Sequence, residues 1–78
     1  MTKAELLEHI DEGIRTEESA TALYLKHMDA IVTRSGRPNH EVEQMRGVIA
    51  FLVRANRHHK ELLEGLRQQI EAEDINVY

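Results

Sequence analysis

Glu17, Asn56 and His59 are polar residues that interrupt two otherwise apolar helical stripes, and their types could bind a metal. Carboxylate, imidazole and amide groups offer the oxygen and nitrogen ligands that suit divalent iron, zinc or manganese. A carboxylate in a helical core is costly unless it finds a partner or a cation. The three residues therefore predict either a metal site or a hydrogen-bonded polar layer.

Around these residues, apolar side chains recur at alternating spacings of three and four, which is typical of coiled coils and helical bundles. The first stripe contains Leu7, Ile10, Ile14, Glu17, Thr21, Tyr24, Met28 and Ile31. The second stripe contains Val42, Met45, Ile49, Leu52, Asn56, His59, Leu63, Leu66 and Ile70. We therefore expect two long helices, each with one face toward a shared core.

A single break separates the two stripes. Gly36 suits a left-handed helix end, Pro38 cannot continue a helix, and Asn39 suits an N-cap. At the start of the chain, Thr2 followed by Glu5 fits a capping box. These signals predict where the first helix begins and ends and where the second helix begins.

The expected layout is one domain, 1–78, of the all-α class. We expect helices over about 3–32 and 40–72, with a turn at 33–39 between them. The tail, 73–78, is expected to fray or to begin a further segment.

Two long helices joined by a short turn pack antiparallel, so residues at equal distances from the turn lie side by side. Glu17 precedes the centre of the turn by about 19 residues, and Asn56 follows it by about as many. We therefore expect Glu17, Asn56 and His59 to share one layer in the middle of the hairpin.

The chain is short for a stable core, since it has 78 residues of which 41% are hydrophobic. It has no cysteine, which excludes disulfides and thiolate metal sites. Small folds without such staples usually need a metal or association with another chain. A second apolar stripe would let two hairpins form a four-helix bundle. Its residues are Leu6, Ala20, Leu23, Val48, Phe51, Ala55 and Leu62.

Charge and hydropathy exclude two classes of partner. The net charge of −4 disfavours nucleic acid, whose phosphates need a basic surface. No stretch approaches the ~20 apolar residues of a membrane span, and the first residues do not resemble a signal peptide. We therefore expect a cytoplasmic protein.

The run Glu17-Glu18-Ser19-Ala20-Thr21-Ala22-Leu23-Tyr24 resembles the first metal-ligand helix of rubrerythrin and related ferritin-like proteins. In that superfamily the next ligand helix carries Glu-x-x-His, with both residues facing inward. The run Asn56-Arg57-His58-His59 stands at the matching place, with asparagine where the family has glutamate. The resemblance covers nearly the whole chain, as half of the usual four-helix unit. Half-length chains that complete the bundle by dimerising resemble the encapsulated ferritins.

The resemblance implies a ferritin-like protein that binds iron between subunits. Glu17 and His59 would be ligands with Asn56 beside them. The resemblance assigns no role to Glu18 or His58; by position, Glu18 beside Glu17 would line an entry path, and His58 beside His59 would be an extra ligand or, more often, a solvated surface residue. The implied activity is a ferroxidase reaction, in which oxygen or peroxide oxidises Fe(II). The implied partners are further copies of the chain, as a homodimer or larger oligomer, and an encapsulin shell around them.

An alternative interpretation needs no metal chemistry. A core asparagine such as Asn56 can fix the register of a helical bundle, and Glu17 and His59 can pair with each other. The chain would then be a structural or interaction module. No residue is assigned to nucleophilic catalysis, because neither Ser19 nor Ser35 has a recognisable His and Asp partner.

Overall fold

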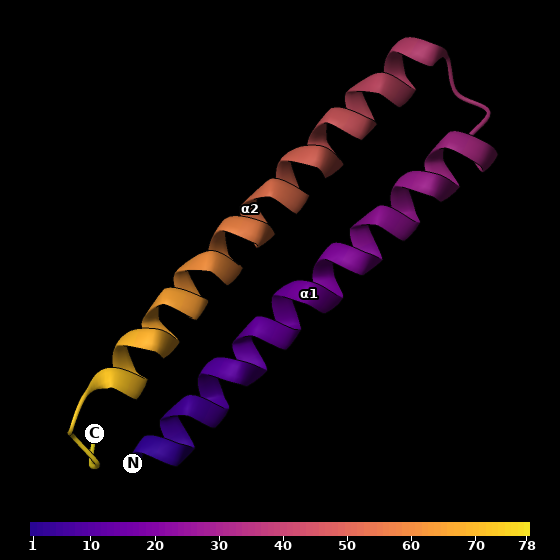
Figure 1. Ribbon diagram of the computed structural model, residues 1–78. Coiled ribbons are helices and arrows are strands. Elements are labelled where there is room, and N and C mark those ends of the chain that lie inside the picture. The colour runs from indigo at the N-terminus through magenta and orange to yellow at the C-terminus, as the bar shows by residue number, and fades with distance from the viewer.

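Two helices make up nearly the whole protein. The computed structural model describes residues 1–78, with α1 at Lys3–Arg34 and α2 at Asn39–Ala72. The two helices run antiparallel, side by side, and form a rod of 57 × 15 × 12 Å (Figure 1). The predicted two-helix antiparallel hairpin is therefore confirmed. Neither helix combines the length and the apolar character that crossing a membrane requires.

The helix ends follow the sequence signals at Thr2 and Gly36 but not at Asn39. The Thr2 hydroxyl oxygen accepts a hydrogen bond from the Glu5 backbone N–H at 3.2 Å, and Gly36 has a φ of 61°. The prediction of Asn39 as N-cap is wrong, because Asn39 is already the first residue of α2. Pro38 takes the cap position. Its carbonyl accepts hydrogen bonds from the backbone N–H groups of Glu41 and Val42, at 3.1 and 3.2 Å.

The tail, 73–78, does not fray, because it runs back along the start of the chain (Figure 1). The Lys3 backbone N–H donates to the Asn76 carbonyl at 3.2 Å. The Lys3 ammonium group donates to the carbonyls of Glu71 and Glu73 at 2.9 and 2.5 Å. α2 has no basic residue in its own last turn, so Lys3 supplies the positive charge that a helix C-terminus favours.

The core between the helices is thin. Its only buried side chains are Ile10, Ile49, Val53 and Ile70. Three of these belong to the predicted stripes, but Val53 does not, since the prediction placed Leu52 in the core instead. A well-packed domain of this length would bury many more apolar side chains, so the hairpin alone has a marginal core.

The side of α2 that faces α1 is rotated from the predicted one. The predicted and observed core positions of α2 both include Ile49, Asn56 and Ile70, but the structure buries Val53 where the prediction had Leu52. Likewise it turns Leu66 outward, with 41% of its surface exposed. This rotation brings two cationic side chains of α2 to carboxylates of α1, in the pairs Lys60–Glu18 and Arg67–Asp11.

The rotation also gives the hairpin two unlike broad faces. One, the apolar face, exposes five large apolar side chains: Leu23 on α1, and Val48, Phe51, Leu62 and Leu66 on α2. Steps of three and four residues from His59 lead to all four residues of α2, so His59 lies on this face. The opposite, charged face carries the Lys60–Glu18 and Arg67–Asp11 pairs.

The Asp11–Arg67 pair makes stability depend on pH in the acid range. Arg67 donates two hydrogen bonds to the Asp11 carboxylate, at 2.7 and 3.4 Å, and this contact lowers the pKa of Asp11. A lowered folded-state pKa means that the unfolded chain binds the proton more readily. The stabilising contribution is therefore present above the usual Asp pKa of about 3.9 and is lost as the pH falls through the lower folded value.

We expect Asp11→Asn to remove this part of the acid destabilisation. Urea midpoints measured at fixed protein concentration between pH 6 and pH 2 should fall less steeply for the variant than for the wild type. Asp29→Asn is the matched control, since Asp29 is an exposed aspartate of α1 without an ion pair. Equal slopes for Asp11→Asn and wild type would show that the contact does not contribute.

Candidate metal centre

Glu17 and His59 meet in the middle of the hairpin, in the layer predicted from the nearly equal distances of Glu17 and Asn56 from the turn. The Glu17 carboxylate oxygen Oε1 lies 3.4 Å from Nδ1 of His59. Glu17 is mostly buried, with 22% of its side chain exposed, whereas His59 is 55% exposed on the apolar face. The pair therefore spans from the interface between the helices to the open surface of that face.

The separation of these two atoms fits a shared cation. Nitrogen and oxygen ligands lie about 2.0–2.2 Å from a divalent ion such as zinc, so two neighbouring ligands on one ion are about 3.0–3.5 Å apart. The 3.4 Å between Glu17 and His59 lies within this range. One chain thus offers one carboxylate and one imidazole at a separation compatible with a shared ion.

Asn56 lies beside the pair, in the seam between the helices. Its amide nitrogen Nδ2 is buried and has no hydrogen-bond partner in the protein. Together with Glu17, Asn56 lines a polar cavity of about 230 Å³ that opens on the charged face. A buried donor without a partner is costly, so this amide is a position where a ligand would be favoured.

The two secondary candidates are placed differently from each other. Glu18 lines the same polar cavity but is engaged by Lys60, whose ammonium nitrogen lies 3.2 Å from its carboxylate. His58 is exposed and makes no hydrogen bond or ion pair. Glu18 is thus near the site, whereas His58 is placed as a solvated surface residue would be.

A single chain does not complete a metal site. No three side chains among its His, Asp and Glu residues lie close enough to hold a metal ion together. Glu17 and His59 provide two ligands, and a stable site for a divalent ion needs at least three or four. The residues present fit half of a metal site, so further ligands would have to come from another copy.

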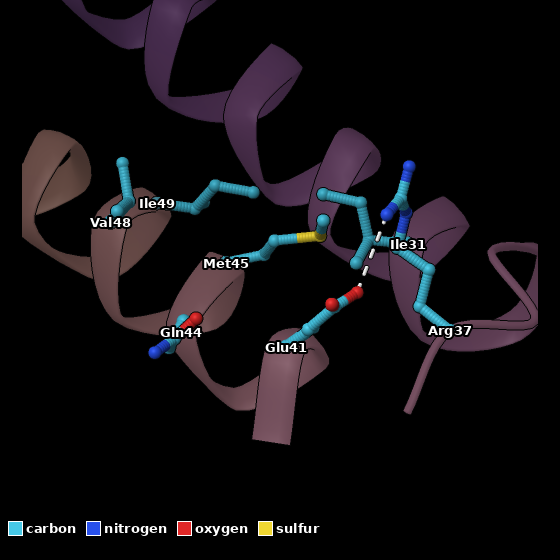
Figure 2. A pocket seen from close by; sticks show the side chains of 7 residues that line it. All are labelled: Ile31, Arg37, Glu41, Gln44, Met45, Val48 and Ile49. Atoms are coloured by element: carbon cyan, nitrogen blue, oxygen red, sulfur yellow. Dashed lines mark hydrogen bonds and ion pairs between the residues drawn. The ribbon is translucent and has the colours of Figure 1, made fainter. Parts of the chain in front are cut away.

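A larger cavity of about 480 Å³ lies beside the turn (Figure 2). Its charged lining residues, Arg37 and Glu41, pair with each other at 3.3 Å. Figure 2 shows that pair lying over Ile31, with Met45 between the two helices. Because the ionisable groups are already paired and the rest of the lining is largely apolar, this cavity offers no ligand set and instead extends the apolar face toward the turn.

The sequence prediction missed Arg57 and Lys60, which also line the polar cavity. Neither residue belongs to the two predicted stripes. The signal that could have found Lys60 is the alternative heptad, which continues from Val53 through Asn56 to position 60.

Comparison with protein-family models, curated proteins and solved structures finds no match to this chain. The candidate centre is therefore supported by the geometry of Glu17, His59 and Asn56 alone.

Proposed function

We propose that this protein is a ferritin-like metal-binding protein that works as a homodimer or a multiple of one. In this proposal each chain supplies Glu17 and His59 to a site shared between two copies, with Asn56 beside them. The observation that carries the proposal is the Glu17–His59 pair, at ligand spacing, in the middle of an exposed apolar face.

The need for a second copy follows from burial. Only four of 78 residues are buried, while five large apolar side chains are exposed on one face. Soluble monomers rarely expose a contiguous apolar surface of this kind, and such surfaces usually mark an interface. A second hairpin covering the apolar face would give each helix two neighbours, as in a four-helix bundle.

The spacing of the apolar residues suggests how two copies would meet. Phe51 precedes His59 by eight residues and Leu66 follows it by seven, which is about 12 and 11 Å at 1.5 Å per residue. A two-fold axis perpendicular to the helices at the level of His59 would place the Phe51 end of one copy on the Leu66 end of the other. The same axis would bring two Glu17–His59 pairs together.

Such a dimer would offer two carboxylates, two imidazoles and two amides around one enclosed space. This donor set suits one or two divalent ions, and iron is favoured over zinc or manganese only by the ferritin-like resemblance. Fe(II) bound there would be the substrate, giving an electron to dioxygen or peroxide. The protein would contribute charge, ligand geometry and exclusion of bulk water between the two apolar faces.

Metal content per chain tests this proposal. After aerobic Fe(II) loading and gel filtration, we expect elemental mass spectrometry to find about one iron per chain or one per two chains, in the dimer fraction. Parallel loading with zinc and manganese measures the preference among metals. An intact oligomer that retains none of the three metals would rule out the metal site.

One observation favours a second candidate, a structural module that only assembles. Glu17 and His59 pair with each other at 3.4 Å, so the polar layer is already partly satisfied without an ion. In that case Asn56 and the pair would fix the register of the bundle. The metal-loading experiment separates the two candidates.

A further inference from the structure

The polar cavity on the charged face has an unusual balance of donors and acceptors. It has a volume of about 230 Å³, enough for one small ion with some of its water. No hydrophobic residue lines it. Its residues are Glu17, Glu18, Thr21, Asn56, Arg57 and Lys60.

The carboxylates of the cavity already have partners. Glu17 lies 3.4 Å from His59, and Glu18 lies 3.2 Å from the Lys60 ammonium group. The Lys60 ammonium offsets the negative charge that Glu18 would otherwise present to the cavity, and the Glu17 oxygen Oε1 is turned toward the His59 ring. A second cation entering from the charged face would therefore meet carboxylates already engaged, together with two positive side chains.

The donors of the cavity, in contrast, are largely free. The Asn56 amide nitrogen is buried without an acceptor. The Arg57 guanidinium forms no ion pair, and the Thr21 hydroxyl forms no hydrogen bond. The buried Asn56 donor favours an acceptor, and the exposed Arg57 guanidinium offers a planar fork of N–H groups that matches the oxygens of an oxyanion.

We propose that this cavity binds a small oxyanion of the phosphate class. Arg57 would supply the charge and a pair of N–H donors, the Asn56 amide a third donor, and the Thr21 hydroxyl a fourth. Lys60, which lies 3.2 Å from Glu18 and 3.8 Å from Glu64, would form part of the rim with its charge already shared between these carboxylates. The anion would sit on the charged face, on the side of Glu17 away from the apolar face.

The oxyanion would also affect the metal centre, and this part of the inference rests on the proposed function. Asn56 brings no charge to the site, whereas a carboxylate there would bring one negative charge. A phosphate beside Glu17 would supply negative charge next to the ion and so strengthen its binding. The anion site itself does not need a metal, because its donors are free in the metal-free protein.

Calorimetric titration of the metal-free protein with inorganic phosphate tests the site, with ionic strength held constant by chloride. Binding should be measurable in the wild type and weakened about tenfold or more in Arg57→Gln, the loss expected for a charge-assisted hydrogen bond. Arg54→Gln is the matched control, since Arg54 is an exposed arginine of α2 outside the cavity. Its affinity should stay within about twofold of wild type.

A second variant distinguishes the cavity from a general charge effect. Asn56→Leu keeps every charge but removes the buried donor, and it should also weaken phosphate binding. Absence of binding in the wild type, or equal losses in Arg57→Gln and Arg54→Gln, would overturn the proposal. Phosphate binding by a protein that retains no metal would disprove the proposed function and leave the anion site standing.

Discussion

Phe51→Asp is expected to convert the protein from a dimer to a monomer and to remove its metal-binding capacity. Phe51 is 62% exposed on the apolar face, so a second copy would cover it. Burying a phenylalanine contributes about 2 kcal/mol, and a two-fold interface contains two of them. Losing both contributions corresponds to about a thousandfold weaker dimer, and the cost of burying two carboxylates adds to this.

Sedimentation equilibrium over a range of concentrations measures the change. Leu25→Asp is the matched control. Leu25 is also apolar and exposed, but it lines a separate cavity with Val32 and Arg46, on the side of the charged face. It should leave the dimer intact. A dimeric Phe51→Asp together with a monomeric Leu25→Asp would mean that the other face is the interface, and a monomeric wild type would refute self-association altogether.

The sequence predicts which side of α1 faces the core better than it does for α2, and the reason is physical. On α1, the predicted 3-4 repeat through Ile10, Ile14 and Tyr24 contains the one buried side chain of that helix, Ile10. On α2, apolar residues stand at both Leu52 and Val53, so hydrophobic periodicity alone does not decide which of them faces α1. The choice depends on contacts with α1, which the pattern of one helix does not contain.

The centre of the site was predictable because it depends on symmetry about the turn. Glu17 lies 19 residues before Gly36 and Asn56 lies 20 after it, which places the two at one level of the hairpin, with His59 one turn further along α2. The exposure of the His59 side chain was not predictable in the same way. The rotation of α2 that buries Val53 also leaves His59 on the apolar face.

The contact between the tail and Lys3 depends on backbone groups and had no sequence pattern to indicate it. The Lys3 ammonium group binds carbonyls at the C-terminus of α2, and the tail pairs with the first residues through main-chain hydrogen bonds. Side chains of the tail such as Val77 stay exposed. A short tail without helix signals gives no pattern that separates a docked tail from one that frays.

Replacing both Glu17 and His59 by leucine should abolish metal binding while leaving the bundle folded. If the pair binds a metal, the wild type gains about 2.7 kcal/mol of stability at a hundredfold excess of metal over its dissociation constant, and the double variant gains none. Denaturation with and without added metal measures this difference, and elemental analysis measures the bound metal. The control is His9→Leu with Glu12→Leu, which removes a His–Glu pair of 3.8 Å on the exposed surface of α1.

The same double variant separates a metal site from a register device. A metal site predicts loss of bound metal, whereas a register device predicts loss of the single oligomeric state. Replacing a buried polar pair by apolar residues usually keeps or raises stability, whereas losing a register device costs the unique oligomeric state. A metal-free variant with an unchanged, single dimer would therefore assign the pair to metal binding. A variant that binds no less iron than wild type would refute Glu17 and His59 as ligands. If the wild type retains no metal and the variant is stable but forms several oligomers, the pair serves to align the helices.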